Sequence, residues 1–239
     1  MKTDAHHRLV FCCGAPESGK SYRIKSELAA TRPARLVVID PDGEYPDAGY
    51  LHDSLGDFYR SLVHPHFSTR FRPAIDRNTA EKQFDQICRM VRWLVDPQPG
   101  QTPPASRAPV TFVCDELADF IGPSFRESPA SFQWIIRRGR KHGVSVLLAS
   151  QRPAEISKTV FDLASVIRAG RLNTDASIKS VAGSVGVSIE DMRGLIGHEY
   201  FERDKRDGKL TGKSLLVKKQ PDRPAGRPSV ARQGARRGK

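Results

Sequence analysis

Eight residues near the start of the chain, GAPESGKS, have the types and spacing that phosphate binding requires. They match the pattern G-x-x-x-x-G-K-[ST], in which glycines let the backbone bend until successive N–H groups point at a phosphate. Lys20 adds positive charge, and the Ser21 hydroxyl is an oxygen ligand that suits Mg²⁺. The motif follows the apolar run Leu9–Cys13, a predicted strand, and precedes a helix predicted over Ser21–Ala30. We therefore expect ATP to bind to Gly14, Ala15, Pro16, Glu17, Ser18, Gly19, Lys20, Ser21 and Tyr22.

A pair of carboxylates ends a second apolar run, VTFVCDE. Asp115 stands where it could hold Mg²⁺ together with Ser21, as a phosphate loop requires a metal-side carboxylate. Glu116, the next residue, could orient and polarise an attacking water molecule. An Asp-Glu pair in this position favours hydrolysis over transfer to a small acceptor.

Two further stretches carry candidate catalytic residues. Gln151 ends the run VSVLLASQ, where a strand-end amide could sense the γ-phosphate. In RRGRKHG, a helix is expected to bring Arg137, Arg140 and Lys141 to one face, from which an arginine could reach the nucleotide of a neighbouring subunit. The simpler alternative is that these cations stabilise the carboxyl end of their helix.

The elements that position these residues alternate between strand-like and helix-like stretches. Apolar runs predict strands over 9–13, 35–40, 110–116, 144–151 and 165–172. Helical periodicity predicts a helix over 79–95 with Thr79 as its cap, one around Phe132, Ile135 and Ile136, and two short helices within 174–196. Residues 199–217 predict a hairpin with its turn at Asp207-Gly208. This order predicts an α/β fold with a mostly parallel sheet covered by helices on both faces, and ligands bind such sheets at the carboxyl ends of the strands.

Composition narrows the class of protein. The chain has 239 residues, 38% of them hydrophobic, and no apolar run approaches the roughly 20 residues of a membrane span. We expect no signal peptide, no membrane insertion and a cytoplasmic location. The four cysteines are expected to be buried thiols, because three lie in predicted strands and Cys88 lies on the apolar face of a helix. The histidines are scattered and do not indicate a metal site.

Positive charge is concentrated at the end of the chain. Residues 203–239 hold 13 Lys and Arg against three Asp, whereas residues 1–202 hold 26 basic and 24 acidic residues. We expect residues 1–217 to form the core and residues 218–239 to form a disordered basic tail. Such a tail favours a polyanionic partner, most simply nucleic acid, although a solvated tail that only aids solubility is the alternative.

Five stretches in order resemble the FtsK–HerA superfamily of ring-forming, DNA-pumping ATPases. They are GAPESGKS, VIDPDGEY, VTFVCDELADF, RRGRKHGVSVLLASQRP and RAGRLNTDAS, and the match covers roughly residues 8–200. The resemblance implies a RecA-like P-loop core, a hexamer or similar ring, and ATP-driven movement of double-stranded DNA. It also implies that Gln151 is the polar sensor and that Arg140 acts in trans. Asp40 and Glu44 match the acidic motif after the second strand, to which we assign no role from sequence.

A bare motor core with a basic tail is most similar to the genome-packaging ATPases of tailless, membrane-containing viruses. This similarity implies double-stranded DNA and capsid or portal-vertex proteins as partners, and a location in the host cytoplasm or with the virion. Two alternatives stay open: a cellular HerA-like repair motor that works with a nuclease, and a nucleotide-dependent virion assembly factor that moves no DNA.

Overall fold

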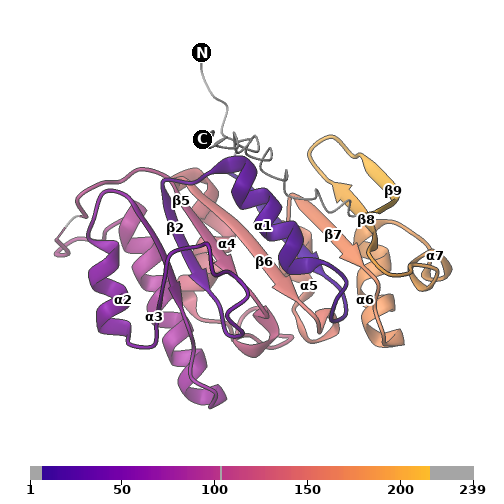
Figure 1. Cartoon of the computed structure of the whole chain (residues 1–239), viewed down its shortest axis with the longest axis horizontal. Helices are drawn as coiled ribbons and strands as arrows, with labels where there is room; N and C mark the ends of the chain where they lie inside the picture. Colours follow the sequence, from indigo (N-terminus) through magenta and orange to yellow (C-terminus); the bar gives the residue numbers. More distant parts are fainter. Residues whose placement is uncertain (1–6, 103, 216–239) are drawn as a thin grey trace, which may run out of the picture.

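The apolar runs of the sequence form the centre of a mixed sheet, drawn in Figure 1. The computed structural model describes residues 7–102 and 104–215. Within these ranges the sheet has nine strands in the order β3-β4-β2-β5-β6-β1-β7-β8-β9. The strands are β1 (Leu9–Cys13), β2 (Arg35–Ile39), β3 (Tyr50–His52), β4 (Phe67–Phe71), β5 (Val110–Cys114), β6 (Val144–Ser150), β7 (Val166–Gly170), β8 (Glu199–Asp204) and β9 (Leu210–Leu215).

Strands β1 to β7 run parallel to one another, and β8 and β9 extend the sheet in antiparallel fashion from β7. Strand β6 lies between β1 and β5, so Cys13 pairs with Ser150 while Cys114 pairs with Leu148. The segments that follow these three strands therefore emerge at one edge of the sheet, which we call the carboxyl edge. This is the α/β fold with a mostly parallel sheet that the alternating pattern predicted.

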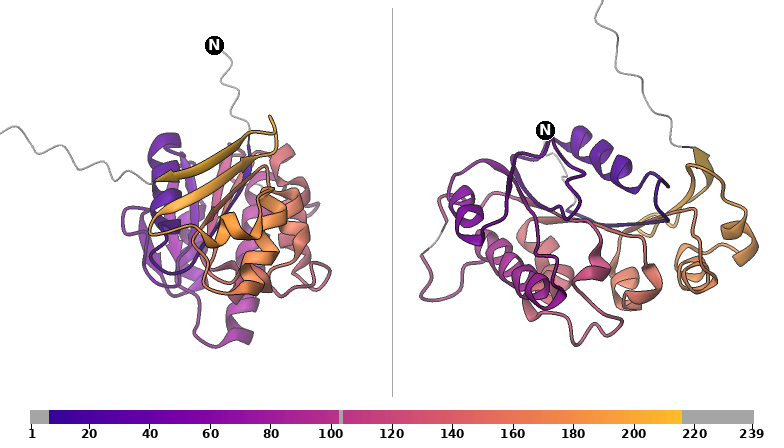
Figure 2. Two further views of the ribbon diagram at one scale, coloured as in Figure 1. Left: turned by 90° about the vertical axis from the view of Figure 1, so that its right-hand side faces the viewer. Right: turned by 60° about the horizontal axis from the view of Figure 1, so that its bottom comes forward.

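The two faces of the sheet are covered unequally, as the right-hand view of Figure 2 shows. One face carries α1 (Lys20–Thr31) and the turn after β2, which enclose a small core that includes Ile24, Val38 and Tyr45. The larger core covers the opposite face. Its helices are α2 (Leu55–Leu62), α3 (Arg77–Val95), α4 (Ala130–Arg138), α5 (Lys158–Leu163), α6 (Asp175–Val185) and α7 (Ile189–Arg193). Three short 3-10 segments, η1 (Leu117–Asp119), η2 (Gly139–His142) and η3 (Pro153–Glu155), connect the elements of this layer.

Helix α1 is held to its face by ion pairs as well as by apolar contacts. Arg168 of β7 pairs with Glu202 of β8 and reaches Glu27 of α1 at 3.4 Å. Arg23 of α1 bonds Glu202 at 2.7 Å, and Arg8 pairs with Glu27. Because these side chains are largely buried, each charge relies on its partners for solvation.

Two local predictions were wrong. Asp76, not Thr79, caps α3: its carboxylate accepts the Thr79 N–H at 2.9 Å, which moves the helix start back to Arg77. Helix α4 ends at Arg138, so Arg140 and Lys141 lie in η2 and do not continue the helical face of Arg137. Other boundaries shift by one or two residues: β2 ends at Ile39 and β6 at Ser150, one residue early, while β5 ends at Cys114 and β7 at Gly170, two residues early.

Two strands, β3 and β4, and two helices, α2 and α5, had no counterpart in the prediction. Strand β4, FSTRF, has three consecutive polar residues between its two phenylalanines, so it lacks the continuous apolar run by which its neighbours were identified. It is placed by pairing with β2, from Arg35 opposite Phe67 to Ile39 opposite Phe71.

The remaining predictions concern the cysteines, the ends and the membrane. All four cysteines are free and buried, and burial raises the pKa of Cys12 to about 11. The hairpin of β8 and β9 and the two short helices α6 and α7 are confirmed. The basic tail predicted over 218–239 lies outside the described residues. Among residues 7–102 and 104–215, none of the helices is both long and apolar enough to span a bilayer.

Candidate nucleotide-binding site

The loop between β1 and α1 has the backbone that its glycines predicted. At Gly14 a Cβ atom would lie 2.3 Å from Ser18 Oγ, so only glycine fits. Gly19, the N-cap residue of α1, has a φ of 89°, in the left-handed region that favours glycine. Glu17 also has a left-handed φ, 60°, which a non-glycine residue adopts only under strain. Ser18 Oγ is buried without a hydrogen-bond partner. The loop is therefore a strained cradle at the amino end of a helix, the geometry that binds phosphate.

The Lys20 side chain and Arg171, which directly follows β7, hold the phosphate loop in this conformation. Lys20 Nζ donates to the Ala15 carbonyl at 3.0 Å, and Ala15 N donates to the Arg171 carbonyl at 2.7 Å. The Arg171 side chain reaches the Pro16 carbonyl at 3.3 Å. Burial lowers the pKa of Lys20, and the Asp115 and Glu116 charges partly offset the shift. The lysine thus stands where a phosphate could replace a carbonyl as its partner.

Asp115 leaves the end of β5 on the α1 side of the carboxyl edge. Asp115 is 7% exposed, and its backbone N–H donates to the Ile39 carbonyl of β2 at 3.1 Å. Burial raises the pKa of this carboxyl to about 6, although Lys20 opposes the rise. A desolvated carboxylate beside Ser21 and Lys20 is a suitable donor for a divalent cation, because the cation would supply the missing counter-charge.

Glu116 has a different set of partners, from the last residue of β6 and the segment that follows it. The Ser150 hydroxyl donates to Glu116 Oε1 at 2.9 Å, and the Gln151 N–H donates to Oε2 at 2.9 Å. The Arg152 guanidinium lies 3.7 Å from Oε1. Burial raises the pKa of Glu116, and these hydrogen bonds oppose the rise. Its backbone φ of 47° is a second strained position at this edge.

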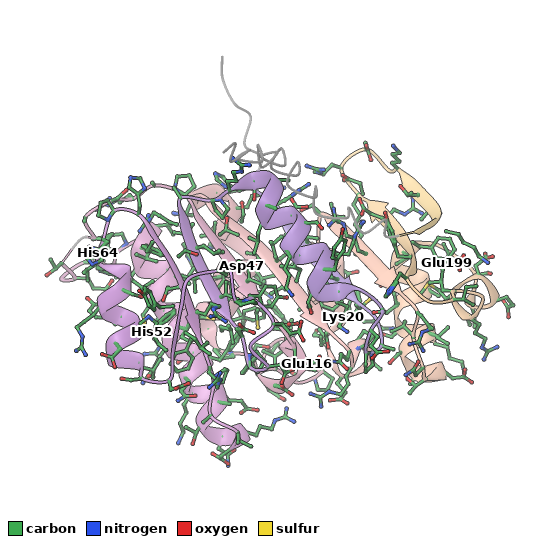
Figure 3. All side chains as sticks on the ribbon, in the orientation of Figure 1. Lys20, Asp47, His52, His64, Glu116 and Glu199 are labelled. Atoms are coloured by element: carbon green, nitrogen blue, oxygen red, sulfur yellow. The ribbon has the colours of Figure 1, made fainter. Side chains whose placement is uncertain are left out.

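A cavity of about 670 Å³ opens beside these groups. Lys20 and Glu116 lie together at the carboxyl edge in Figure 3, whereas His52 and His64 lie far off toward α2. The cavity is lined by Pro16, Glu17, Gly19, Lys20, Ser21, Tyr22, Lys25, Asp42, Glu44, Asp115, Gln151 and His198. The structure thus brings the phosphate loop, Asp115 and Gln151 to one space, while the Glu116 side chain faces Ser150 behind it.

Arg140 is the predicted catalytic residue that does not join this cluster. It is exposed and lies in η2, before β6 begins, whereas Gln151 lies after β6 ends. Seven strand residues, roughly 23 Å of extended chain, separate the two ends. Arg140 therefore cannot reach the phosphate loop of its own chain and could act only on another copy.

The acidic motif after β2 has a structural role that sequence did not assign. The Asp40 carboxylate is fully buried and accepts the N–H groups of Glu44 at 2.7 Å and Tyr45 at 3.2 Å. Arg70 of β4 donates to the same carboxylate at 3.0 Å. Asp40 thus fixes the turn, and Glu44 at its end lies 3.6 Å from Lys25 at the cavity wall.

Comparison with known proteins gives one sequence relative and several structural ones. No protein-family model matches the chain. It is 28% identical over 196 residues to Protein P9 of Pseudoalteromonas phage PM2, and the match covers 80% of each chain. The genome packaging NTPase B204 of Sulfolobus turreted icosahedral virus 2, in complex with ATP-gammaS, has a TM-score of 0.68 at 15% identity, covering 89% of this chain and 100% of B204. VirB4 of Thermoanaerobacter pseudethanolicus has a TM-score of 0.66 at 10% identity, covering 88% and 90%. The structural likeness confirms the predicted P-loop NTPase fold.

Sequence reasoning missed several residues at this site. Ser150 and Arg152 flank Gln151 in the stretch SQRP, and Tyr45 ends the stretch DPDGEY, so each stood inside a motif already noted. His198 had no such signal, because it reaches the cavity through the loop between α7 and β8.

Proposed function

We propose that this chain, a FtsK–HerA-like P-loop ATPase, hydrolyses ATP within a ring of identical subunits and thereby drives double-stranded DNA into a viral capsid. The observation that carries the proposal is that five stretches far apart in the sequence meet at one cavity on the carboxyl edge. The sequence relationship to a phage protein and the fold of a genome packaging NTPase support the viral role.

The triphosphate would occupy the loop from Gly14 to Tyr22. Its backbone N–H groups and the positive end of α1 would bind the phosphates, and Lys20 would exchange the Ala15 carbonyl for a phosphate oxygen. Ser21 and Asp115 would hold Mg²⁺, which would neutralise negative charge on the phosphate oxygens. The desolvated carboxylate of Asp115 fits this assignment.

Glu116 would orient and polarise the attacking water. Ser150 and the Gln151 N–H fix both carboxylate oxygens, so the candidate base and the candidate sensor form one unit. A change at Gln151 in response to the γ-phosphate would therefore move Glu116 as well. Arg140 of a neighbouring copy would stabilise the charge that develops on the phosphate.

Basic groups would hold DNA through its backbone phosphates without reading its sequence. We place part of this binding in residues 218–239, outside the core of residues 1–217. Deletion of residues 220–239 should then weaken binding to DNA or to a capsid protein while leaving basal hydrolysis intact.

The experiment that tests the function measures ATP hydrolysis by the purified chain with and without duplex DNA. DNA should stimulate hydrolysis at low salt, and the stimulation should fall steeply between roughly 50 and 200 mM salt, because counterion release drives binding to phosphates. Lys20→Ala and Glu116→Gln should abolish hydrolysis, whereas Glu81→Gln on the exposed face of α3 should not.

Electron microscopy with an ATP analogue and duplex DNA should show rings with a threaded strand. Hydrolysis that ignores DNA at low salt would instead support an assembly factor that moves no DNA. Near-normal turnover by Glu116→Gln would remove that residue from its assigned role.

A further inference from the structure

One buried hydroxyl beside the candidate metal site has no assigned purpose. Tyr45 is 1% exposed, and its ring lies in the small core under α1 together with Val38 and Ile24. Its Oη atom has no hydrogen-bond partner that meets normal geometry. A hydroxyl buried in this way destabilises a fold by about 1–3 kcal/mol, so we expect it to gain a neighbouring acceptor when the site is occupied.

The direction of this hydroxyl is specific. It faces the Asp115 carboxylate and the Ser21 hydroxyl, the two side chains to which we assign Mg²⁺. These groups come from three separate elements: the turn after β2, the start of α1 and the end of β5. The phenol therefore lies behind both candidate ligands, because Ser21 and Asp115 line the cavity and Tyr45 does not.

The backbone of Tyr45 is held by Asp40, the residue at the start of the turn. Asp40 accepts the Tyr45 N–H and is itself held by Arg70, so the turn cannot swing outward without breaking a buried hydrogen bond. On the outer side, the Lys25 ammonium lies 5.6 Å from the centre of the Tyr45 ring. The backbone and the ring are fixed while the hydroxyl is left unsatisfied.

We propose that Tyr45 is a positioning residue of the metal site: its hydroxyl donates a hydrogen bond to the Asp115 carboxylate and thereby holds it in the orientation that binds Mg²⁺ with Ser21. The inference rests on the proposed function, because it concerns the same metal site. It also gives the stretch DPDGEY a purpose, since Asp40 and Arg70 fix the turn that presents the phenol.

The test uses the full chain and measures metal binding without turnover. Mn²⁺ is titrated by electron paramagnetic resonance into wild type and Tyr45→Phe, each saturated with the non-hydrolysable analogue AMPPCP. Loss of an outer hydrogen bond to a metal ligand weakens metal affinity by about 10–100-fold, so Tyr45→Phe should bind Mn²⁺ at least about 10-fold more weakly. Its affinity for AMPPCP without metal and its unfolding temperature should not fall. Tyr59→Phe, on α2 against Trp93, is the matched control and should bind Mn²⁺ as wild type does.

Each outcome separates this inference from the proposed function. Equal Mn²⁺ affinity in Tyr45→Phe and wild type would overturn the role of Tyr45 while leaving the metal site intact. Equal loss of Mn²⁺ affinity and of metal-free AMPPCP affinity would also overturn it, because the phenol would then support the whole cavity. Failure of wild type to bind Mn²⁺ with AMPPCP would refute the metal site itself, and the proposed function with it.

Discussion

Asp115 and Glu116 are adjacent in sequence, yet each meets a separate set of residues. Asp115 lies among Lys20, Ser21 and Tyr45 on the α1 side, whereas the partners of Glu116 come from the end of β6 and the segment that follows it. The left-handed backbone of Glu116 turns the chain between them and separates the two carboxylates. Neighbouring acids can therefore take different tasks, one toward a metal and one toward water.

The desolvated Asp115 destabilises the nucleotide-free protein. The pKa of its carboxyl rises from 3.8 to about 6, so the folded state resists ionisation more than the unfolded state does. Above pH 6 the resulting destabilisation of the folded state is present in full. It vanishes as the pH falls toward 3.8, because the carboxyl is then protonated in both the folded and the unfolded state. Asp115→Asn should therefore increase the free energy of unfolding at pH 7.5 by on the order of 2–3 kcal/mol, because a neutral side chain avoids this penalty.

Urea unfolding of the metal-free and nucleotide-free protein checks this prediction. The gain in Asp115→Asn should shrink as the pH is lowered from 7 to 5. Asp42→Asn, an exposed acid on the wall of the same cavity, should show no gain. A lower stability in Asp115→Asn at pH 7.5 would mean that the carboxylate is better solvated than its burial indicates.

At the scale of the elements, the ion pairs under α1 fix the position of this helix on the sheet. They thereby also fix the phosphate loop, which leads into the helix. Arg168 is central, since it serves Glu27 of α1 and Glu202 of β8. Arg168→Met keeps the apolar stem but leaves both acids short of a partner. Because Arg8 and Arg23 remain, we expect a loss of about 2 kcal/mol in the free energy of unfolding, less than for a fully orphaned buried charge.

Urea unfolding of Arg168→Met beside Arg60→Met measures that loss. Arg60 pairs with Asp57 on the exposed face of α2, so its replacement should leave the midpoint nearly unchanged. If the two variants unfold at the same urea concentration, α1 is held by its apolar contacts alone.

The central elements could be predicted because each of their signals is local. Strands β1, β2, β5, β6 and β7 are short runs buried on both faces, and the hairpin turn carries Asp207-Gly208. Strands β3 and β4 depend on pairing beside β2, which a single segment does not encode. The phosphate loop and the two carboxylates were likewise recognisable as motifs. The contacts of Ser150 with Glu116 and of Tyr45 with Asp115 were not, because they arise only when β6 and β2 take their places on either side of β5.

For the whole molecule, the distance between Arg140 and the phosphate loop decides whether one chain can be a complete enzyme. Arg140 lies at the amino end of β6, on the edge of the sheet opposite to Lys20. If it completes the site of a neighbour, Lys20→Ala and Arg140→Ala damage different halves of each interface. Mixing two inactive variants in equal amounts should then restore hydrolysis at about a quarter of the interfaces of a head-to-tail ring.

Hydrolysis by the mixture, compared with each variant alone, tests this prediction. Wild-type activity per chain should also fall on dilution. Arg126→Ala, another exposed arginine, should remain active alone and serves as the control. A mixture no more active than its components would show that Arg140 does not act across the interface.

Strand β9 brings the chain back to the carboxyl edge, since Leu215 pairs with Glu199 at the start of β8, next to the end of β7. The 24 residues that follow carry eight Lys and Arg against one Asp, and their contour is at most about 80 Å. If these residues bind DNA as we propose, the bound polymer stays close to the edge where ATP would be hydrolysed. Such tethering would raise the local concentration of that polymer around the catalytic groups. A weak interaction would then suffice to keep it bound between successive rounds of ATP hydrolysis.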